Sequence, residues 1–215
     1  SAASTAARDR TFGARLACAG LQGSRARAAA PEGSDIDAVV ILNHLTPEDL
    51  AAYRALVRTL PYAELACGFI GGREELLGWD PAELVTFYYD TVPLVGNLDF
   101  LLPRLTREAA LRAVQTGAGG VYHAACHGFV FEKGWDPTGC YKAAFFLLRA
   151  KHFFETGDFV LREADLLPLL KGKDREILLR RIDTEANGEA DRMDDARRLM
   201  EWSGGILRSF AKEGI

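Results

Sequence analysis

The sequence has no apolar run long enough to cross a membrane. A spanning helix needs roughly 18 or more consecutive apolar residues, and every apolar run in this chain of 215 residues is shorter. Residues 1–10 are small and polar, without the basic stretch followed by an apolar one that marks an export signal. We therefore expect a soluble, cytoplasmic protein that does not bind membranes.

Cysteine pairs at short spacing are also missing. The four cysteines, Cys18, Cys67, Cys126 and Cys140, lie far apart and include no C-x-x-C pair. This pattern argues against a zinc ribbon and against a disulfide framework. We expect reduced and buried thiols instead.

The chain lacks an excess of positive charge. Its 26 Lys and Arg are outnumbered by 30 Asp and Glu, which gives a formal net charge of −4. Such a balance provides no general attraction to a nucleic-acid backbone. A small-molecule acceptor is therefore favoured over a long polymer. The hydrophobic share of 48% is enough for one sizeable core or two small adjoining cores.

Strand and helix patterns alternate in the first half. The continuous apolar run at residues 38–42 predicts a strand buried on both faces. Residues 47–60 predict a helix, because a threonine N-cap and a proline at the first helical position precede the apolar periodicity. A second strand is expected over residues 63–70, and another helix opens at Asp80.

Beyond residue 103 the patterns become helical, and β-rich runs are few. Residues 141–148 are apolar nearly all round, which predicts the buried central helix of a small bundle. The change of character predicts a boundary near residues 97–106. We therefore expect two domains, residues 1–102 and 103–215.

An acidic pair stands at the entrance of the first apolar strand. Asp35 and Asp37 follow the turn-forming Gly23 and Ser24 after ten intervening residues. Side chains alternate along an extended chain, so the two aspartates share one face. Two carboxylates this close repel each other, and a cation makes the arrangement tolerable. Oxygen ligands suit Mg²⁺ or Mn²⁺, so we predict that both residues are catalytic metal ligands.

The Gly23-Ser24 turn is predicted to bind a nucleoside triphosphate. Glycine permits a close approach to the backbone N–H groups, and a helix start favours an anion. Arg25 and Arg27 are further candidates for phosphate oxygens. Together with the acidic pair, these groups predict in-line displacement at the α-phosphate, in which a carboxylate takes the acceptor's proton.

Residues 23–27 (GSRAR) and 34–37 (SDID) resemble the signature of the polymerase-β-like nucleotidyltransferase superfamily. The resemblance is to its small bacterial branch, which includes the aminoglycoside nucleotidyltransferases. It implies an α+β fold, with a nucleotidyltransferase-type mixed sheet and flanking helices, followed by a C-terminal helical bundle that helps to bind substrate. It also implies metal ligation by the two aspartates and triphosphate contact at the Gly-Ser turn. One departure is Ala28, where the family usually has glycine.

The family's third carboxylate has no clear counterpart, and three residues are candidates for it. Glu64 opens the second expected strand and would face the acidic pair if the two strands were neighbours, so it is our candidate metal ligand; a solvated strand end is the alternative. Asp90 follows a run of aromatic residues, where a hydrogen-bonded helix carboxylate is an equal alternative. Asp99 could instead cap or flank the connection between the domains.

The helical half contains further candidates. Lys142 lies among apolar residues and could reach a phosphate, although a surface lysine is the alternative. Glu132 is a candidate general base for the acceptor, or it is only a charged helix end. His123 and His127 are four apart on a predicted helix, where a zinc site, a structural role and contact with the substrate all remain open.

These features predict the metal-dependent transfer of a nucleoside monophosphate, with AMP as the expected group, from a nucleoside triphosphate. The expected acceptor is a hydroxyl of a small polar molecule such as an aminoglycoside-type antibiotic. A protein-modifying nucleotidyltransferase, such as an antitoxin, and a non-catalytic nucleotide-binding module remain as alternatives. We expect the acceptor to bind between the two halves, because ligand sites favour domain interfaces. The sequence leaves open whether the chain is a monomer or a homodimer.

Overall fold

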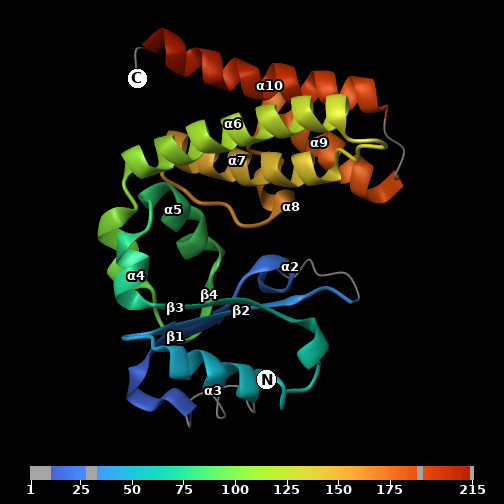
Figure 1. Cartoon of the computed structure of the whole chain (residues 1–215). Coiled ribbons are helices and arrows are strands. Elements are labelled where there is room, and N and C mark those ends of the chain that lie inside the picture. The colour runs from blue at the N-terminus through green and yellow to red at the C-terminus, as the bar shows by residue number, and fades with distance from the viewer. Residues whose placement is uncertain (1–10, 28–32, 188–190, 214–215) are drawn as a thin grey trace. The chain divides into compact units, whose positions relative to one another are not determined.

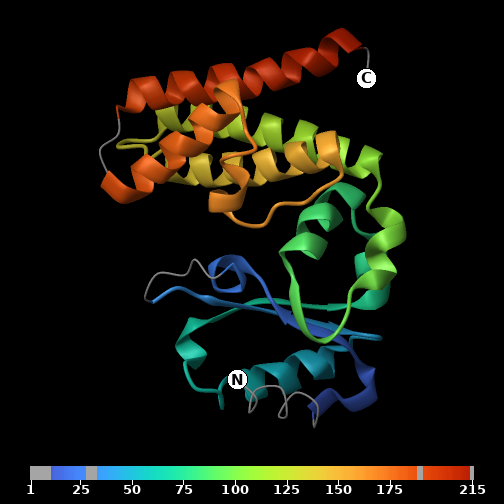
Figure 2. The same ribbon diagram turned by 180° about the vertical axis from the view of Figure 1, so that it is seen from behind.

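The computed structural model in Figures 1 and 2 describes residues 11–27, 33–187 and 191–213 of the chain. Ser1 to Arg10 and Ala28 lie outside the described residues. Contacts divide the chain into two compact units, Ser1–Leu105 and Thr106–Ile215. A mixed sheet with flanking helices is followed by a helical bundle, so the predicted α+β class is confirmed. None of the helices described is long and apolar enough to cross a membrane.

The sheet of the first unit has the strand order β3-β2-β1-β4. β1 (Leu16–Leu21) pairs antiparallel with β2 (Ile36–Leu42) and with β4 (Val92–Gly96), while β2 pairs parallel with β3 (Ala66–Gly72). β2 is therefore an internal strand, as its apolar run predicts. Its last four residues are fully buried.

Helices cover both faces of this sheet (Figure 1). α3 (Pro47–Val57) packs on the face that carries Val40 and Leu42. α4 (Arg73–Gly78) and α5 (Pro81–Asp90) pack on the opposite face. Both helices predicted in this half exist, because their N-caps, Thr46 and Asp80, accept hydrogen bonds from first-turn amides as the sequence indicates.

Long helices form the second unit: α6 (Arg107–Phe131), α7 (Thr138–Thr156), α9 (Gly172–Asn187) and α10 (Arg192–Glu213), with the one-turn helix α8 (Glu163–Leu166). α7 contacts both α6 and α9, and α10 contacts α6. The prediction of a buried helix at residues 141–148 is confirmed for Tyr141, Ala144, Phe145, Leu147 and Leu148. Lys142 and Ala143 are exposed on the same helix.

The core of the second unit contains charged groups that the sequence did not reveal. Asp195 of α10 is fully buried and accepts hydrogen bonds from the Tyr141 hydroxyl at 2.7 Å and from Arg180 Nε at 2.8 Å. Arg149 is also fully buried; its guanidinium carbon lies 4.6 Å from the Phe159 ring centre. Buried charged groups need such partners, because an unpaired charge would lose its hydration without any compensating attraction. The Asp195 group thus ties α7, α9 and α10 together.

The cysteines differ from expectation in their burial. Cys18 and Cys140 are buried, but Cys126 is half-buried and Cys67 is exposed, and all four thiols are free. The expectation of buried thiols is therefore wrong for Cys67. Its strand, β3, is at the edge of the sheet, and the first residues of that strand are exposed.

Candidate functional site

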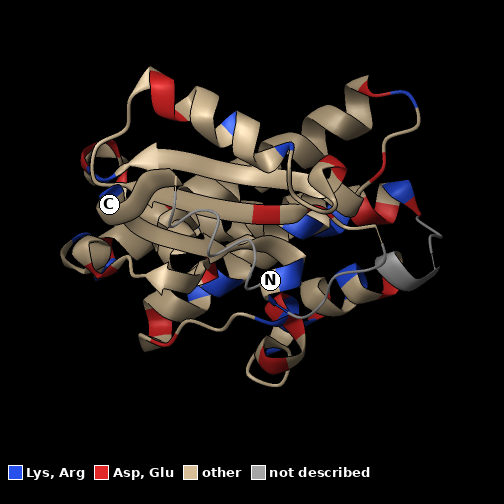
Figure 3. Cartoon of the chain, turned by 90° about the horizontal axis from the view of Figure 1, so that it is seen from below, with Lys and Arg blue, Asp and Glu red and all other residues tan. Residues whose placement is uncertain are grey.

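Asp37 is the only charged residue in the four strands that the structure describes. Those strands are accordingly almost free of charge colours in Figure 3. Asp37 is half-buried near the start of β2, and Val39 and Ile41, which share its face by alternation, belong to the core under α4 and α5. The carboxylate therefore lies at the end of the sheet face that α5 covers.

Gly23 lies directly against this carboxylate. A Cβ added at Gly23 would overlap Oδ2 of Asp37, and Gly23 has a φ of +72°, which favours glycine. The backbone N–H of the preceding residue, Gln22, donates to the Asp37 carbonyl oxygen at 2.8 Å. The structure thus brings together the glycine turn and one member of the acidic pair, and only glycine leaves room for both.

The turn continues into α2 (Gly23–Ala26), a one-turn helix that contains Ser24. Nε2 of Gln22, its N-cap, donates to the Thr91 hydroxyl at 2.8 Å and to the Phe87 carbonyl oxygen at 3.1 Å. These bonds fix the turn to the C-terminal end of α5. The sequence gives no sign of them, because Gln22 and Thr91 belong to distant segments.

Arg25 fixes the segment that enters β2. Its Nη2 donates to the Ser34 carbonyl oxygen at 2.6 Å, and its Nε is 3.1 Å from the carbonyl oxygens of Ser34 and Asp35. These bonds hold the backbone on which the acidic pair is carried. Arg25 is therefore a positioning residue in the structure, and its predicted phosphate contact remains a prediction.

Arg27 connects the turn to another carboxylate. Its Nη1 is 3.7 Å from Oδ1 of Asp90, the last residue of α5, and both side chains are largely buried. Arg27 also ends the turn, since its N–H donates to the Gly23 carbonyl oxygen at 3.3 Å. The structure thus places Asp90, one of three candidates for a third carboxylate, beside the glycine turn.

The acidic pair is suitable for a divalent cation that is shared with a substrate. Asp35 is exposed immediately before β2, two residues from the half-buried Asp37. Within residues 11–27, 33–187 and 191–213, no group of three or more His, Cys, Asp or Glu is arranged to hold a metal ion. Mg²⁺ commonly takes one or two carboxylates together with waters and phosphate oxygens. The donor set therefore fits a cation bound jointly with a triphosphate, rather than one enclosed by protein.

The strand predicted to begin at residue 63 is wrong in its start, and this affects Glu64. Tyr62 has a φ of +62°, and the chain then forms the 3₁₀ helix η2 (Ala63–Leu65), so β3 begins only at Ala66. Glu64 lies exposed in that helix, and it is Cys67 that pairs with Asp37 in the β2–β3 register. The register argument for Glu64 as a metal ligand therefore fails.

The candidates of the helical half belong to the second unit. Glu132 is the C-cap of α6; its side chain is 58% exposed and its Oε1 is 3.6 Å from Nδ1 of His127. Lys142 is exposed on α7, which agrees with the surface-lysine alternative. The rings of His123 and His127 are 5.5 Å apart. The base role of Glu132 and the phosphate role of Lys142 stay predictions.

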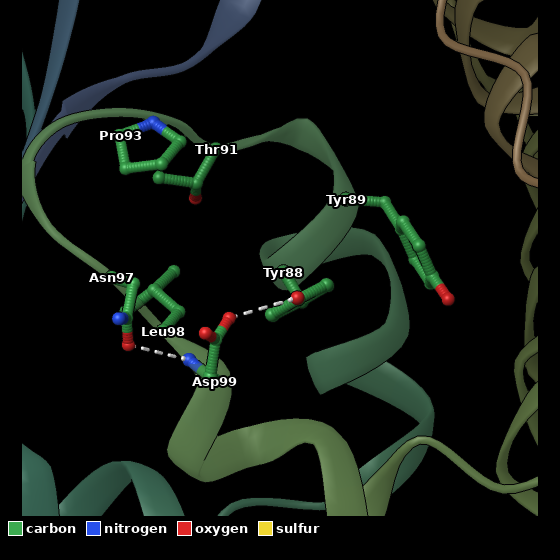
Figure 4. A pocket seen from close by; sticks show the side chains of 7 residues that line it. All are labelled: Tyr88, Tyr89, Thr91, Pro93, Asn97, Leu98 and Asp99. Carbon is green, nitrogen blue, oxygen red and sulfur yellow. Dashed lines mark hydrogen bonds between the residues drawn. The ribbon is translucent and has the colours of Figure 1, made fainter.

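A cavity of about 190 Å³ adjoins the α5 end of this site (Figure 4). It is lined by Tyr88, Tyr89, Thr91, Pro93, Asn97, Leu98 and Asp99. Thr91 is shared between the cavity and the site, because its hydroxyl accepts the hydrogen bond from Gln22. The Tyr88 hydroxyl donates to Oδ1 of Asp99 at 3.2 Å. The cavity therefore reaches Thr91, the residue that directly follows Asp90.

No family model matches the sequence, and no curated protein matches it. Among solved structures, the chain is similar to the crystal structure of spectinomycin adenyltransferase AAD(9) from Enterococcus faecialis, determined with ATP and spectinomycin. The TM-score is 0.58 at 12% sequence identity, over 97% of this chain and 99% of that chain. At this identity the similarity shows the fold alone, which this chain shares with that adenyltransferase along nearly its whole length.

Proposed function

We propose that this protein transfers a nucleoside monophosphate, with AMP as the expected group, from a nucleoside triphosphate to a hydroxyl of a small polar acceptor such as an aminoglycoside-type antibiotic. The observation that carries the proposal is the contact between Gly23 and the Asp37 carboxylate. It supports a triphosphate turn and an acidic metal ligand at one place. The ATP and spectinomycin bound by the structural neighbour support the choice of nucleotide and acceptor class.

Asp35 and Asp37 would hold Mg²⁺ or Mn²⁺, and the Gly23 N–H and the Ser24 hydroxyl would bind the triphosphate. The cation, when bound, neutralises charge on the attacking and leaving oxygens. Gly23 allows phosphate oxygens to approach the backbone without displacing Asp37. Arg25 keeps the acidic pair in place through the carbonyl oxygens of Ser34 and Asp35.

Asp90 is the third carboxylate and the general base in this proposal, in place of Glu64 and Glu132. It is 7% exposed and belongs to the same unit as the acidic pair, and Arg27 holds it beside the turn. A carboxylate in this position can accept the proton of the acceptor hydroxyl as the oxygen attacks the α-phosphate and pyrophosphate leaves. Arg27, whose charge is permanent, can move from Asp90 towards an incoming phosphate. That exchange would free Asp90 for the proton.

A second candidate function is the modification of a protein acceptor, and the end of α6 favours it. Val130 and Phe131 are 66% and 75% exposed at this helix end. Exposed apolar groups of this kind are typical of protein-binding surfaces. The catalytic residues would be unchanged, and the acceptor would be a side-chain hydroxyl of the partner.

The test is a transfer assay with the purified chain. The protein is incubated with each of the four nucleoside triphosphates, magnesium and a panel of aminoglycosides and aminocyclitols, followed by mass spectrometry. We expect one antibiotic to gain the mass of a nucleoside monophosphate, with wild-type protein but not with Asp37→Asn. A protein adduct instead would support the second candidate. No adduct with any triphosphate would refute nucleotidyl transfer.

A further inference from the structure

The cavity beside α5 has an acidic wall without a basic partner. Asp99 is exposed at the start of η3 (Asp99–Arg104), and its Oδ1 accepts a hydrogen bond from the Tyr88 hydroxyl. Within the described parts of the chain, no Lys, Arg or His forms an ion pair with Asp99, and none lines the cavity. The carboxylate therefore keeps its negative charge unpaired at the wall of a hollow.

The other lining groups suit a cation on a hydroxylated ring. The rings of Tyr88 and Tyr89 are 5.1 Å apart and nearly perpendicular, and an ammonium group is attracted to aromatic faces. Figure 4 shows Asn97 close to Asp99, whose backbone N–H donates to the Asn97 side chain at 3.1 Å. Burial and the Asp99 carboxylate raise the pKa of Tyr88, so this phenol stays a hydrogen-bond donor.

The same lining residues disfavour an anionic ligand in the cavity. A phosphate here would meet an unpaired carboxylate without any cationic side chain from the lining. The triphosphate therefore belongs at the Gly23 turn and not in this cavity. The volume of about 190 Å³ is near that of six waters in the liquid, so it has room for one ring.

We propose that this cavity is the subsite for an amine-bearing ring of the acceptor, with Asp99 pairing with the protonated amine and Tyr88 and Asn97 contacting the ring's hydroxyl groups. This inference rests on the proposed nucleotidyl transfer for its connection to catalysis. Its position supports that connection, because Thr91 lines the cavity while bonding to Gln22, the residue before the glycine turn.

Binding can be measured without any transfer. The probes are 2-deoxystreptamine, a six-membered ring with two amines, and myo-inositol, a ring of the same size with hydroxyls only. We expect ligand-observed NMR of the full chain to show binding of the diamine in preference to inositol. Asp99→Asn should raise the Kd of the diamine at least about tenfold, the effect of losing about 1.4 kcal/mol.

Glu83→Gln is the matched control, because it removes one exposed negative charge from α5, the helix that carries Tyr88, at a residue that does not line the cavity. It should leave the Kd of the diamine within about twofold of wild type. Tyr88→Phe removes only the hydroxyl that bonds to Asp99 and should weaken the diamine less than Asp99→Asn does. An undetectable diamine interaction in wild type, or equal weakening by Glu83→Gln, would overturn the subsite.

A second arm separates the subsite from the proposed function. Asp99→Asn should raise the KM of the amine acceptor at least about tenfold while the Kd of ATP stays unchanged. A shift in the Kd of ATP instead would make the cavity a nucleoside site and overturn the proposal. If the wild-type protein transfers no nucleotide and Asp99→Asn abolishes diamine binding, the subsite stands and the proposed function fails. If the wild-type protein transfers a nucleotide and Asp99→Asn binds the diamine as tightly as wild type does, the proposed function stands and the subsite fails.

Discussion

The guanidinium of Arg27 lies 3.7 Å from the carboxylate of Asp90, with the two side chains only 13% and 10% exposed. This ion pair joins the glycine turn to the C-terminal end of α5. Burying two charged side chains to this extent costs hydration free energy unless the charges are paired. The pair therefore holds a carboxylate where the proposed reaction needs a base.

Asp90→Asn is expected to reduce kcat by at least about 10²-fold, the low end of the range for general base catalysis. The KM of ATP should change little, because in the proposed mechanism Asp90 contacts the acceptor's proton rather than the triphosphate. Steady-state kinetics with the acceptor found in the transfer assay provide the measurement. Glu64→Gln is the control and should keep wild-type kcat, since Glu64 lies exposed in η2. A large loss of kcat in Glu64→Gln with an unchanged kcat in Asp90→Asn would instead identify Glu64 as the third carboxylate.

Asp37→Asn should lower kcat by about 10²-fold or more while leaving the fold intact. The free energy of unfolding without metal should be equal or higher, because one of two like charges at the strand entrance is removed. Asp35→Asn should behave in the same way. Urea unfolding and transfer kinetics on the same preparations check both parts. Turnover near that of wild type in either variant would exclude the proposed metal ligands.

Gly23→Ala should destabilise the first unit and abolish transfer. The added methyl would overlap Asp37 Oδ2 and would require a left-handed backbone conformation. The backbone term alone costs about 1–2 kcal/mol. Gly33→Ala separates the two effects, because Gly33 has a φ of +81° but a Cβ there meets nothing within 4 Å. This control should lose similar backbone stability yet retain transfer, as circular dichroism and kinetics can show.

Asp195→Ala should cost about 3–5 kcal/mol, since it leaves the Arg180 guanidinium without its buried carboxylate. Asp183→Ala is a matched control, because Asp183 also binds Arg180, at 2.8 Å, but is 52% exposed. Exposed pairs contribute about 0.2–1 kcal/mol. Chemical unfolding should therefore separate the two variants widely. Equal losses would mean that Asp195 does not stabilise the contact of α7, α9 and α10.

The stability of the first unit should fall in acid through Asp49. Two hydrogen bonds from Arg15 hold the pKa of this carboxyl below its usual 3.8. A lowered folded pKa means that the contribution is present above pH 3.8 and is lost as pH falls through the folded value. Asp49→Asn should flatten that part of the stability profile. Glu48→Gln, at an exposed acid of the same first turn, should leave it unchanged.

The sequence predicted those elements whose patterns are local. β2 follows from its apolar run, and α3 follows from Thr46 and the proline after it, because capping and burial act within a few residues. The start of β3 was missed, because the left-handed Tyr62 and the 3₁₀ turn after it have no strong signature.

The site was predictable only where it is contiguous in sequence. The Gly23 turn and Asp37 share one short motif, and the structure brings them into contact. Asp90 could not be chosen over Glu64, because its place depends on an ion pair between the turn and α5. The burial of Asp195 was equally hidden, since Tyr141 and Arg180 come from other helices.

The tryptophans are divided between the two units in a way that makes each unit visible in fluorescence. Trp79 packs against the sheet core of the first unit, with the Phe69 ring 5.2 Å away. Trp135 and Trp202 are buried in the helical core of the second unit, where Trp202 Nε1 donates to Asp174 at 2.8 Å. In Trp79→Phe, tryptophan fluorescence therefore comes only from Trp135 and Trp202 of the helical unit. Comparing its unfolding curve with that of wild type would show whether the two units unfold together.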